Sequence, residues 1–133
     1  MSGVVHRPVR ERWIEGDPNV VNGMLRLAHI ARMSKSALFR GDWALLGEAM
    51  TENHEIIRSL GSSSEINEKL IQIALDAGAI AAKLAGAGKG GTIIALAPEK
   101  EPLVAALSEA GVKRLLFPEP SDGVRREKGE ENL

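Results

Sequence analysis

Apolar residues recur at helical spacing through the first half of the chain, between residues that start and stop helices. Asp17 followed by Pro18 is typical of a helix start, because aspartate caps the first turn and proline fits the first helical position. The spacing predicts a helix that runs to about Arg40, with Gly41 as its stop. Its apolar positions are Met24, Leu27, Ala28, Ala31 and Leu38.

Two further helices are predicted from the same kind of pattern. Asp42 can cap a second helix that ends at Gly61, so that the first two helices form an αα-hairpin. The run from Ser62 to Glu65 has the spacing of a capping box, and Gly78 closes the third helix. The predicted apolar stripes are Trp43, Leu46, Met50, Ile57 and Leu60 in the second helix, and Ile66, Leu70, Ile73, Ala74 and Ala77 in the third.

Short apolar runs in the second half predict strands. Residues 79–84 and 92–97 flank a glycine-rich stretch and are expected to pair as a hairpin. A fourth helix is predicted over residues 99–110, with Leu103 and Leu107 facing inward, and a third strand over 112–117. The order of elements predicts an α+β domain in which helices stack on a small antiparallel sheet.

The two ends of the chain have weaker patterns. In residues 1–16, Val4 and Val5 could be the remnant of a strand, and Trp13 and Ile14 would need burial. Residues 118–133 form a charged tail with little to bury, and its end is expected to be disordered. The domain itself is therefore placed at residues 17–117.

Composition excludes several classes of protein. The 133 residues suit one domain, and a net charge of −1 gives no argument for binding nucleic acid or a membrane. There is no cysteine, and the three histidines have no metal-ligand spacing. Because we find neither a signal peptide nor an apolar span, a cytoplasmic protein is expected.

Four glycines, Gly86, Gly88, Gly90 and Gly91, lie within six residues. Such a run is typical of a loop whose backbone N–H groups approach an anion such as phosphate, although a tight hairpin turn is an equal alternative on spacing alone. The run satisfies G-x-G-x-x-G, but a strand-like segment follows it where the dinucleotide motif needs a helix. A P-loop also fails, because Gly90 stands where serine or threonine would hold magnesium.

Residues 79–96, with Lys83 and the run Gly86-Ala87-Gly88-Lys89-Gly90-Gly91, resemble the third motif of the GHMP small-molecule kinases, close to Gly-Ala-Lys-x-Thr/Ser-Gly-Ala-Gly-x-Gly-Gly. The resemblance extends from about residue 5 to residue 126. It implies a ferredoxin-like C-terminal domain whose glycine loop, Gly86 to Gly91, lines the phosphate and substrate cleft, with Lys83 as a further cleft candidate. Two positions depart from the motif: Ala85 replaces the hydroxyl residue, and Lys89 adds a cation.

The resemblance also shows what this sequence lacks. The family's N-terminal domain, with its Pro-x-x-x-Gly-Leu-Gly-Ser-Ser-Ala loop and its catalytic residues, has no counterpart here, so we assign no catalytic residue and no metal ligand. ATP and magnesium are implied for the complete kinase, and neither is expected to bind this chain tightly. The implied partner is an N-terminal kinase domain, and the implied substrate is a small alcohol, mevalonate or sugar-like.

Four expectations remain beside this assignment. The chain could instead be a free-standing binding or regulatory module without catalytic activity. An isolated half of a two-domain enzyme should expose an apolar face, so self-association into a homo-oligomer is a further expectation. Lys83 is expected to pair with a surface carboxylate, and His54 to be a satisfied histidine on a helix face rather than a ligand.

Overall fold

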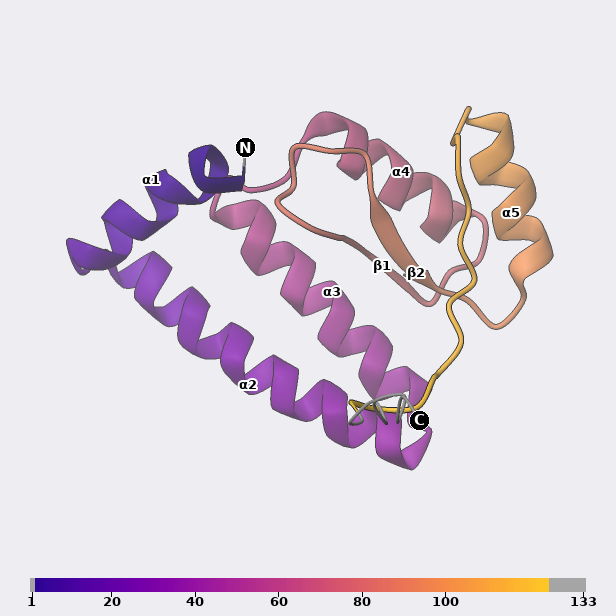
Figure 1. Cartoon of the computed structure of the whole chain (residues 1–133), viewed down its shortest axis with the longest axis horizontal. Coiled ribbons are helices and arrows are strands. Elements are labelled where there is room, and N and C mark those ends of the chain that lie inside the picture. The colour runs from indigo at the N-terminus through magenta and orange to yellow at the C-terminus, as the bar shows by residue number, and fades with distance from the viewer. Residues whose placement is uncertain (1, 125–133) are drawn as a thin grey trace, which may run out of the picture.

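The computed structural model describes residues 2–124, and the side chains of residues 6–124. Figure 1 shows a pair of long antiparallel helices, a two-stranded hairpin beside them, and two shorter helices on the other side of the hairpin. The elements are α1 (Ser2–Ile14), α2 (Pro18–Arg40), α3 (Trp43–Ser59), α4 (Glu65–Asp76), β1 (Ala81–Leu84), β2 (Ile93–Leu96) and α5 (Lys100–Glu109).

The predicted boundaries of α2 and α3 are confirmed because each rests on a local cap. The side chain of Asp17 accepts a hydrogen bond from the backbone N–H of Asn19 at 2.9 Å, and Pro18 opens α2. Gly41 ends α2 with a φ of +64°, a left-handed conformation that glycine adopts at no steric cost. Asp42 then caps α3 by accepting from the Leu45 N–H at 3.0 Å.

The expected strand at Val4 and Val5 is wrong, because both residues lie in α1. This helix packs on the start of α2: Val9 is buried in a small core with Val20 and Leu60. Trp13 and Ile14 stay 43% and 64% exposed, so the burial expected for them does not occur within the described chain. This segment is therefore a helix, which the two valines alone did not predict.

Two details after α3 also differ from expectation. The cap of α4 is Ser64, which accepts from the Asn67 N–H, so Ser62 does not open a capping box. Residues 112–117, which were predicted to form a strand, form none. The Val112 N–H instead donates to the Leu107 carbonyl at the end of α5. Strand formation needs a neighbouring strand at the right register, which a short apolar run cannot specify by itself.

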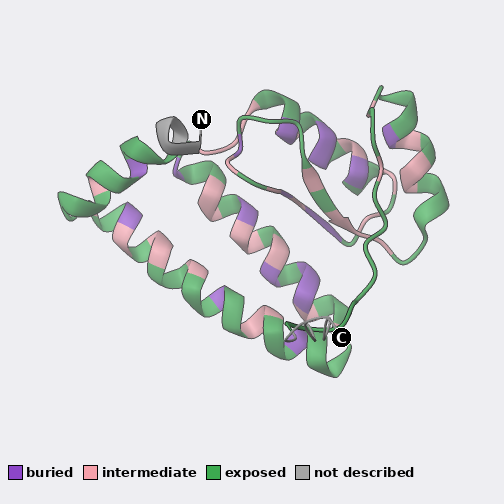
Figure 2. Cartoon of the chain, viewed as in Figure 1, coloured by how far each residue is buried: buried purple, intermediate pink, exposed green. Residues whose placement is uncertain are grey.

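The hairpin lies between α3 and α4, as Figure 1 shows. Its strands are antiparallel, with Ala82 opposite Ala95 and Leu84 opposite Ile93. On the face toward α4, a second core forms around Ile71, Ala74 and Ala82, with Ala79, Ile93, Ala95 and Leu103 packed against it. Figure 2 shows the buried positions concentrated on the inward sides of α3 and α4 and on β1, while β2 is only partly covered.

The described helices leave several large apolar side chains at the surface. Among the residues that the structure describes, no helix has the length and hydropathy needed to cross a membrane. Exposed apolar side chains occur on α2, α3, α4 and β2 and in the segment after α5; examples are Phe39, Trp43, Ile66, Ile94 and Phe117. The helices and the antiparallel hairpin confirm the α+β class. The end of the tail, which was expected to be disordered, lies beyond residue 124 and outside the described residues. The placing of the domain at residues 17–117 remains a prediction.

Candidate phosphate-binding loop

The glycine run forms the connection between β1 and β2. A backbone hydrogen bond from Ala85 N–H to the Thr92 carbonyl, at 3.0 Å, continues the strand ladder to the base of the loop. Gly86 and Gly88 have φ values of +79° and +84°, which only glycine adopts cheaply. The residues predicted as a phosphate loop are therefore brought together at one end of the hairpin, close to the start of α4 (Figure 1).

Gly88 is held tightly against the connection between α3 and α4. A Cβ atom added to Gly88 would lie 1.6 Å from the carbonyl oxygen of Ser62, so no side chain fits there. The Gly88 carbonyl accepts a hydrogen bond from Asn67 Nδ2 at 2.9 Å. The centre of the loop is thus anchored to α4 by a buried side chain.

Asn67 is the residue that sequence reasoning missed. It is completely buried in the first turn of α4, and its Oδ1 has no hydrogen-bond partner among the described residues. The buried stripe of α4 consists of Asn67, Leu70, Ile71 and Ala74. This spacing of i, i+3, i+4 and i+7 is that of an inward helix face, so a polar residue in phase with an apolar stripe was the available signal. Ile66, which we placed inward, is 54% exposed.

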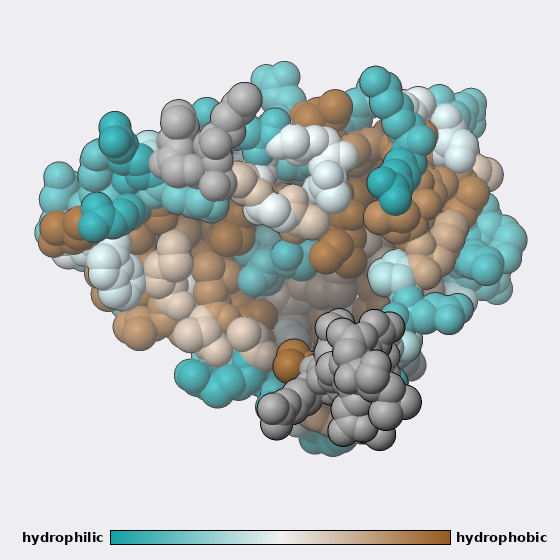
Figure 3. All heavy atoms as spheres, in the orientation of Figure 1, coloured by the Kyte–Doolittle hydropathy of each residue, from teal (hydrophilic) through white to brown (hydrophobic). Residues whose placement is uncertain are grey.

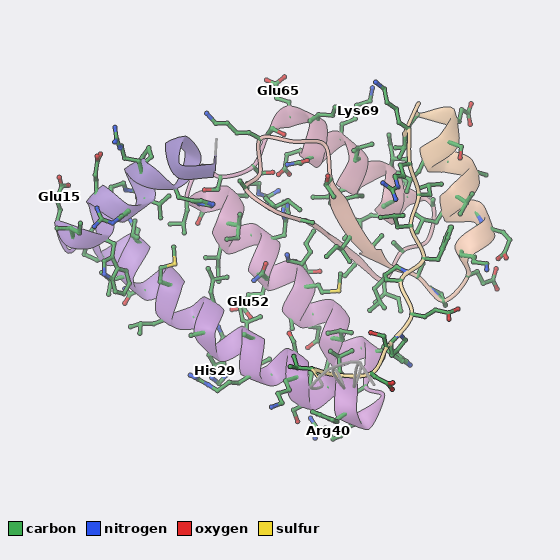
Figure 4. All side chains as sticks on the ribbon, viewed as in Figure 1. Glu15, His29, Arg40, Glu52, Glu65 and Lys69 are labelled. Atoms are coloured by element: carbon green, nitrogen blue, oxygen red, sulfur yellow. The ribbon has the colours of Figure 1, made fainter. Side chains whose placement is uncertain are left out.

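The outer side of the loop is open to solvent. Gly86, Lys89, Gly90, Gly91 and Thr92 are exposed, and Ala87 is half-buried. Within the described chain, Lys89 forms no ion pair, so its ammonium group is available to an anion. Figure 4 shows that Glu65 and Lys69, the labelled side chains of α4, project outward from that helix. The loop can therefore offer backbone N–H groups and one cation to a negatively charged ligand.

Lys83 lies on β1 just before the loop and is half-buried. Its Nζ donates a hydrogen bond to the Leu84 carbonyl at 2.8 Å, rather than pairing with a carboxylate of the described residues as we expected. Burial lowers the pKa of the Lys83 ammonium from its ordinary value. A role for Lys83 in a cleft remains a prediction.

His54 is buried and joins three elements. Its Nδ1 accepts from the Leu84 N–H at 3.5 Å, and its Nε2 lies 2.9 Å from Glu68 Oε1. With Nδ1 accepting, the proton sits on Nε2 and is donated to the carboxylate. The histidine therefore links α3, β1 and α4, which agrees with the expectation of a satisfied structural residue.

Glu68 completes this cluster from α4. Its other oxygen, Oε2, lies 3.4 Å from Arg58 Nη1. Burial raises the pKa of Glu68, but the Ser63 hydroxyl, His54 and Arg58 lower it by more, so the pKa lies below its ordinary value. Glu68 is thus an ionised partner in a structural network behind the loop. Among the described residues, no group of three or more His, Cys, Asp or Glu side chains is placed to hold a metal ion.

An anchored glycine loop at the end of a hairpin, with helices on both sides, defines an α+β domain with a candidate anion site. The family model described as GHMP kinases C terminal matches residues 34–113, more than half of the chain and all of the loop. The chain therefore belongs to the GHMP kinase C-terminal family.

Relatives and solved structures agree with this assignment. The chain is 33% identical to Probable glucuronokinase 2 of Arabidopsis thaliana, over 90% of this chain and 32% of that protein. It is 41% identical to mevalonate kinase of Thermococcus gammatolerans over 62% of this chain and 25% of that protein. The crystal structure of L. major mevalonate kinase in complex with R-mevalonate matches with a TM-score of 0.70 and 28% identity, covering 82% of this chain and 34% of that one.

These matches confirm the resemblance and the fold expected from the sequence. They also show that the chain spans about a third or less of the length of the proteins it resembles. The relatives are therefore much longer than this sequence, and the activity of a whole kinase is a matter for proposal.

Proposed function

We propose that this chain is the C-terminal part of an ATP-dependent GHMP-type kinase that phosphorylates a small-molecule alcohol, and that it needs an N-terminal kinase domain for activity. The observation that carries the proposal is the family match over residues 34–113 in a chain that spans only a third of its kinase relatives. Those relatives are glucuronokinases and mevalonate kinases, so the acceptor is proposed to be mevalonate or a sugar acid.

In this proposal the glycine loop lines the phosphate and substrate cleft. Phosphoryl transfer depends on positioning and on stabilising the charge of the phosphoryl oxygens. The exposed backbone at Gly86, Gly90 and Gly91 and the ammonium of Lys89 suit that task. The loop is held by Asn67 and Ser62, so it can present these groups in a fixed arrangement.

The two cofactors implied by the family fit this chain differently. The exposed loop fits phosphate oxygens, such as those of ATP. Among the described residues, no group of three or more His, Cys, Asp or Glu side chains is placed to hold magnesium, so this chain is not proposed to bind the metal. The nucleotide loop, the metal ligands and the catalytic groups are proposed to come from the N-terminal domain. A cytoplasmic location also remains a prediction from the sequence.

The test is reconstitution. This chain is mixed or co-expressed with a separately produced GHMP kinase N-terminal domain, and ATP-dependent phosphorylation of mevalonate and of glucuronate is assayed. We expect activity only when both parts are present. Each part alone, and the mixture containing Gly88→Val, are the controls.

Failure to restore activity with any compatible N-terminal domain and either substrate would contradict the proposed kinase role. A chain that then still bound phosphate or nucleotide through its loop would instead be the free-standing binding module described above. The two functions are therefore separated by combining the kinase assay with a direct binding measurement on this chain.

A further inference from the structure

Among the lysines that the structure describes, Lys83 alone is half-buried. The exposed ones are Lys35, Lys69, Lys89, Lys100 and Lys113. Lys83 forms no ion pair within the described chain, and its Nζ donates to the backbone carbonyl of Leu84 at 2.8 Å. A carbonyl accepts an N–H from an amine as well as from an ammonium group, so the neutral form of Lys83 keeps this partner and has its lone pair free.

The surroundings of Lys83 favour that neutral form. Burial lowers the pKa of its ammonium group below the ordinary value of 10.5, because a charge is costly to remove from water. A lower pKa leaves a larger share of the side chain unprotonated near pH 8. The unprotonated amine is the nucleophilic form of lysine, and desolvation is a known way to activate it.

The face of the hairpin that carries Lys83 is accessible to small molecules. Successive side chains of a strand lie on opposite faces, and Ala82 is buried in the core against α4. Lys83 therefore lies on the other face, where its partner on β2 is Ile94. Ile94 is 53% exposed, so this face is open to solvent beside the lysine. The amine is thus partly desolvated without being sealed in the core.

The groups suited to hold an anion come directly after Lys83 in the chain. Leu84, whose carbonyl holds the lysine, is followed two residues later by Gly86, so their Cα atoms are at most about 7 Å apart. The exposed loop then offers backbone N–H groups and the ammonium of Lys89. In the space-filling view, the loop end of the hairpin lies at the surface as pale residues of intermediate hydropathy (Figure 3). A phosphate group bound to the loop would lie beside the Lys83 amine.

We propose that Lys83 is a site of acylation by small acyl phosphates, which the glycine loop and Lys89 hold by their phosphate group. The Lys83 nitrogen uses its lone pair to form a bond to the acyl carbon. The bond between that carbon and the phosphate oxygen breaks, inorganic phosphate leaves with the electron pair, and the amine proton passes to water. Lys83 becomes an amide and loses its charge. The inference rests on the phosphate binding of the loop, which is part of the proposed function, and not on phosphoryl transfer.

The test uses this chain and acetyl phosphate. After incubation at pH 8, the chain is cleaved with chymotrypsin, and acetylation of each lysine is quantified by mass spectrometry over time. Lys83 should be acetylated at least about tenfold faster than the exposed Lys35 and Lys113, because a reagent held on the loop has a high local concentration at the amine. Inorganic phosphate in excess competes for the loop and should remove most of this preference.

A second reagent and a pair of variants separate the loop from the lysine itself. N-hydroxysuccinimidyl acetate transfers the same acetyl group but carries no phosphate. Lys89→Ala should slow acetylation of Lys83 by acetyl phosphate about threefold and leave its reaction with the ester unchanged. Lys35→Ala removes an equal charge from α2, near the end of that helix far from the loop, and should change neither rate (Figure 1). Both side chains are exposed, so both variants should fold, which circular dichroism checks.

Two results would overturn the proposal. In the first, acetyl phosphate modifies Lys83 no faster than the exposed lysines. In the second, Lys83 reacts faster, but neither excess phosphate nor Lys89→Ala changes its rate, which would show that burial alone makes it reactive. Because no kinase assay is involved, failure here leaves the proposed kinase function standing. Failed reconstitution together with a phosphate-sensitive preference for Lys83 would leave the acylation site standing.

Discussion

The two outer edges of the β-hairpin differ in how far the rest of the chain covers them. On the β1 edge, the Leu84 N–H is bonded by His54, and α3 approaches so closely at Gly47 that an added Cβ would lie 2.6 Å from Ile80 Cγ2. On the β2 edge, the N–H and C=O groups of Ile93 and Ala95 point away from β1, because residues 92, 94 and 96 are the ones that bond to β1. One edge is covered by a helix and the other is open.

This difference separates the strand edge that the fold satisfies by itself from the edge that it leaves unpaired. A covered strand edge is satisfied within the fold, and an open edge invites another strand. The glycine loop lies on the covered side, because its two contacts come from Ser62 in the connection between α3 and α4 and from Asn67 in the first turn of α4. The following predictions test the contrast, beginning with the largest effect on the free energy of unfolding.

Gly88→Val should damage the fold of the loop most. Valine would have to adopt a φ of +84°, and its Cβ would collide with the Ser62 carbonyl. We expect a loss of at least about 3 kcal/mol in the free energy of unfolding, measured by urea denaturation.

Gly90→Ala is the matched control for that substitution. Gly90 has no positive φ, and no atom lies within 4 Å of its added Cβ, so the change should stay within about 0.5 kcal/mol. Equal effects of the two substitutions would show that the loop is not anchored at Gly88.

His54→Ala should uncover the β1 edge. It removes the partner of the Leu84 N–H, takes the histidine from Glu68 and leaves a cavity, so we expect a loss of about 2–3 kcal/mol. Thr92→Ala, an exposed change at the other end of the hairpin turn, should cost less than about 0.5 kcal/mol. Thermal unfolding followed by circular dichroism compares them, and a mild His54→Ala would mean that α3 does not stabilise this edge through the histidine.

Asn67→Ala should release the centre of the loop. The Gly88 carbonyl loses its donor, but an unpartnered acceptor, Asn67 Oδ1, disappears as well. The two effects offset in part, so we expect a loss of about 1–2 kcal/mol, with faster amide exchange in residues 86–91. If exchange in the loop were unchanged, the bond to Gly88 would not be what holds it.

Glu68→Gln should reduce the sensitivity of the chain to acid. The pKa of Glu68 is lower in the folded chain than its ordinary value of 4.5, so the fold stabilises the ionised form. That stabilisation is complete above the ordinary pKa and is lost as the pH falls through the folded pKa.

The pH series compares the wild type with Glu68→Gln by urea unfolding. Asp17 and Glu52 also have lowered pKa values, each with an arginine as the first cause, and they keep some acid sensitivity in both proteins. The difference between the two curves isolates Glu68. Parallel curves would show that Glu68 gains nothing from His54 and Arg58.

Lys89→Ala should have the smallest effect on stability, less than about 0.5 kcal/mol, because the side chain is exposed and unpaired within the described chain. In the reconstituted kinase it should weaken binding of phosphate or nucleotide, as measured by KM for ATP. Lys113→Ala removes an equal charge away from the loop and should leave KM unchanged. Equal kinetics for both variants would remove Lys89 from the site.

Local signals explain which parts of the fold could be predicted. Asp17, Gly41 and Asp42 fix their helix ends through bonds within a few residues, so α2 and α3 were found correctly. The hairpin also followed from its flanking pattern. Residues 112–117 were not decided locally, because a strand needs a neighbour. Figure 4 shows another distant contact, Glu52 lying between α2 and α3, where it pairs with Arg26.

The position of the candidate site was predictable, but its support was not. The glycine run indicates the loop by composition alone. Its anchors lie 21 or more residues earlier in the chain, as the Asn67–Gly88 bond illustrates. A serine carbonyl has no side-chain signature, and an asparagine within an apolar stripe is visible only when the correct helix face is chosen. We assigned the inward face of this helix through Ile66, and the structure shows that Ile66 is exposed.

The contact between Gly88 and Ser62 holds the loop in place before a ligand binds. A chain segment that must be ordered on binding loses about 1–2 kcal/mol of conformational entropy per residue. This loop is fastened at its base and its centre before any ligand arrives, so most of that loss has already occurred during folding. It is a fixed template rather than a flap. If the chain acts within a kinase as proposed, we therefore expect any closing movement to bring the other domain to the loop.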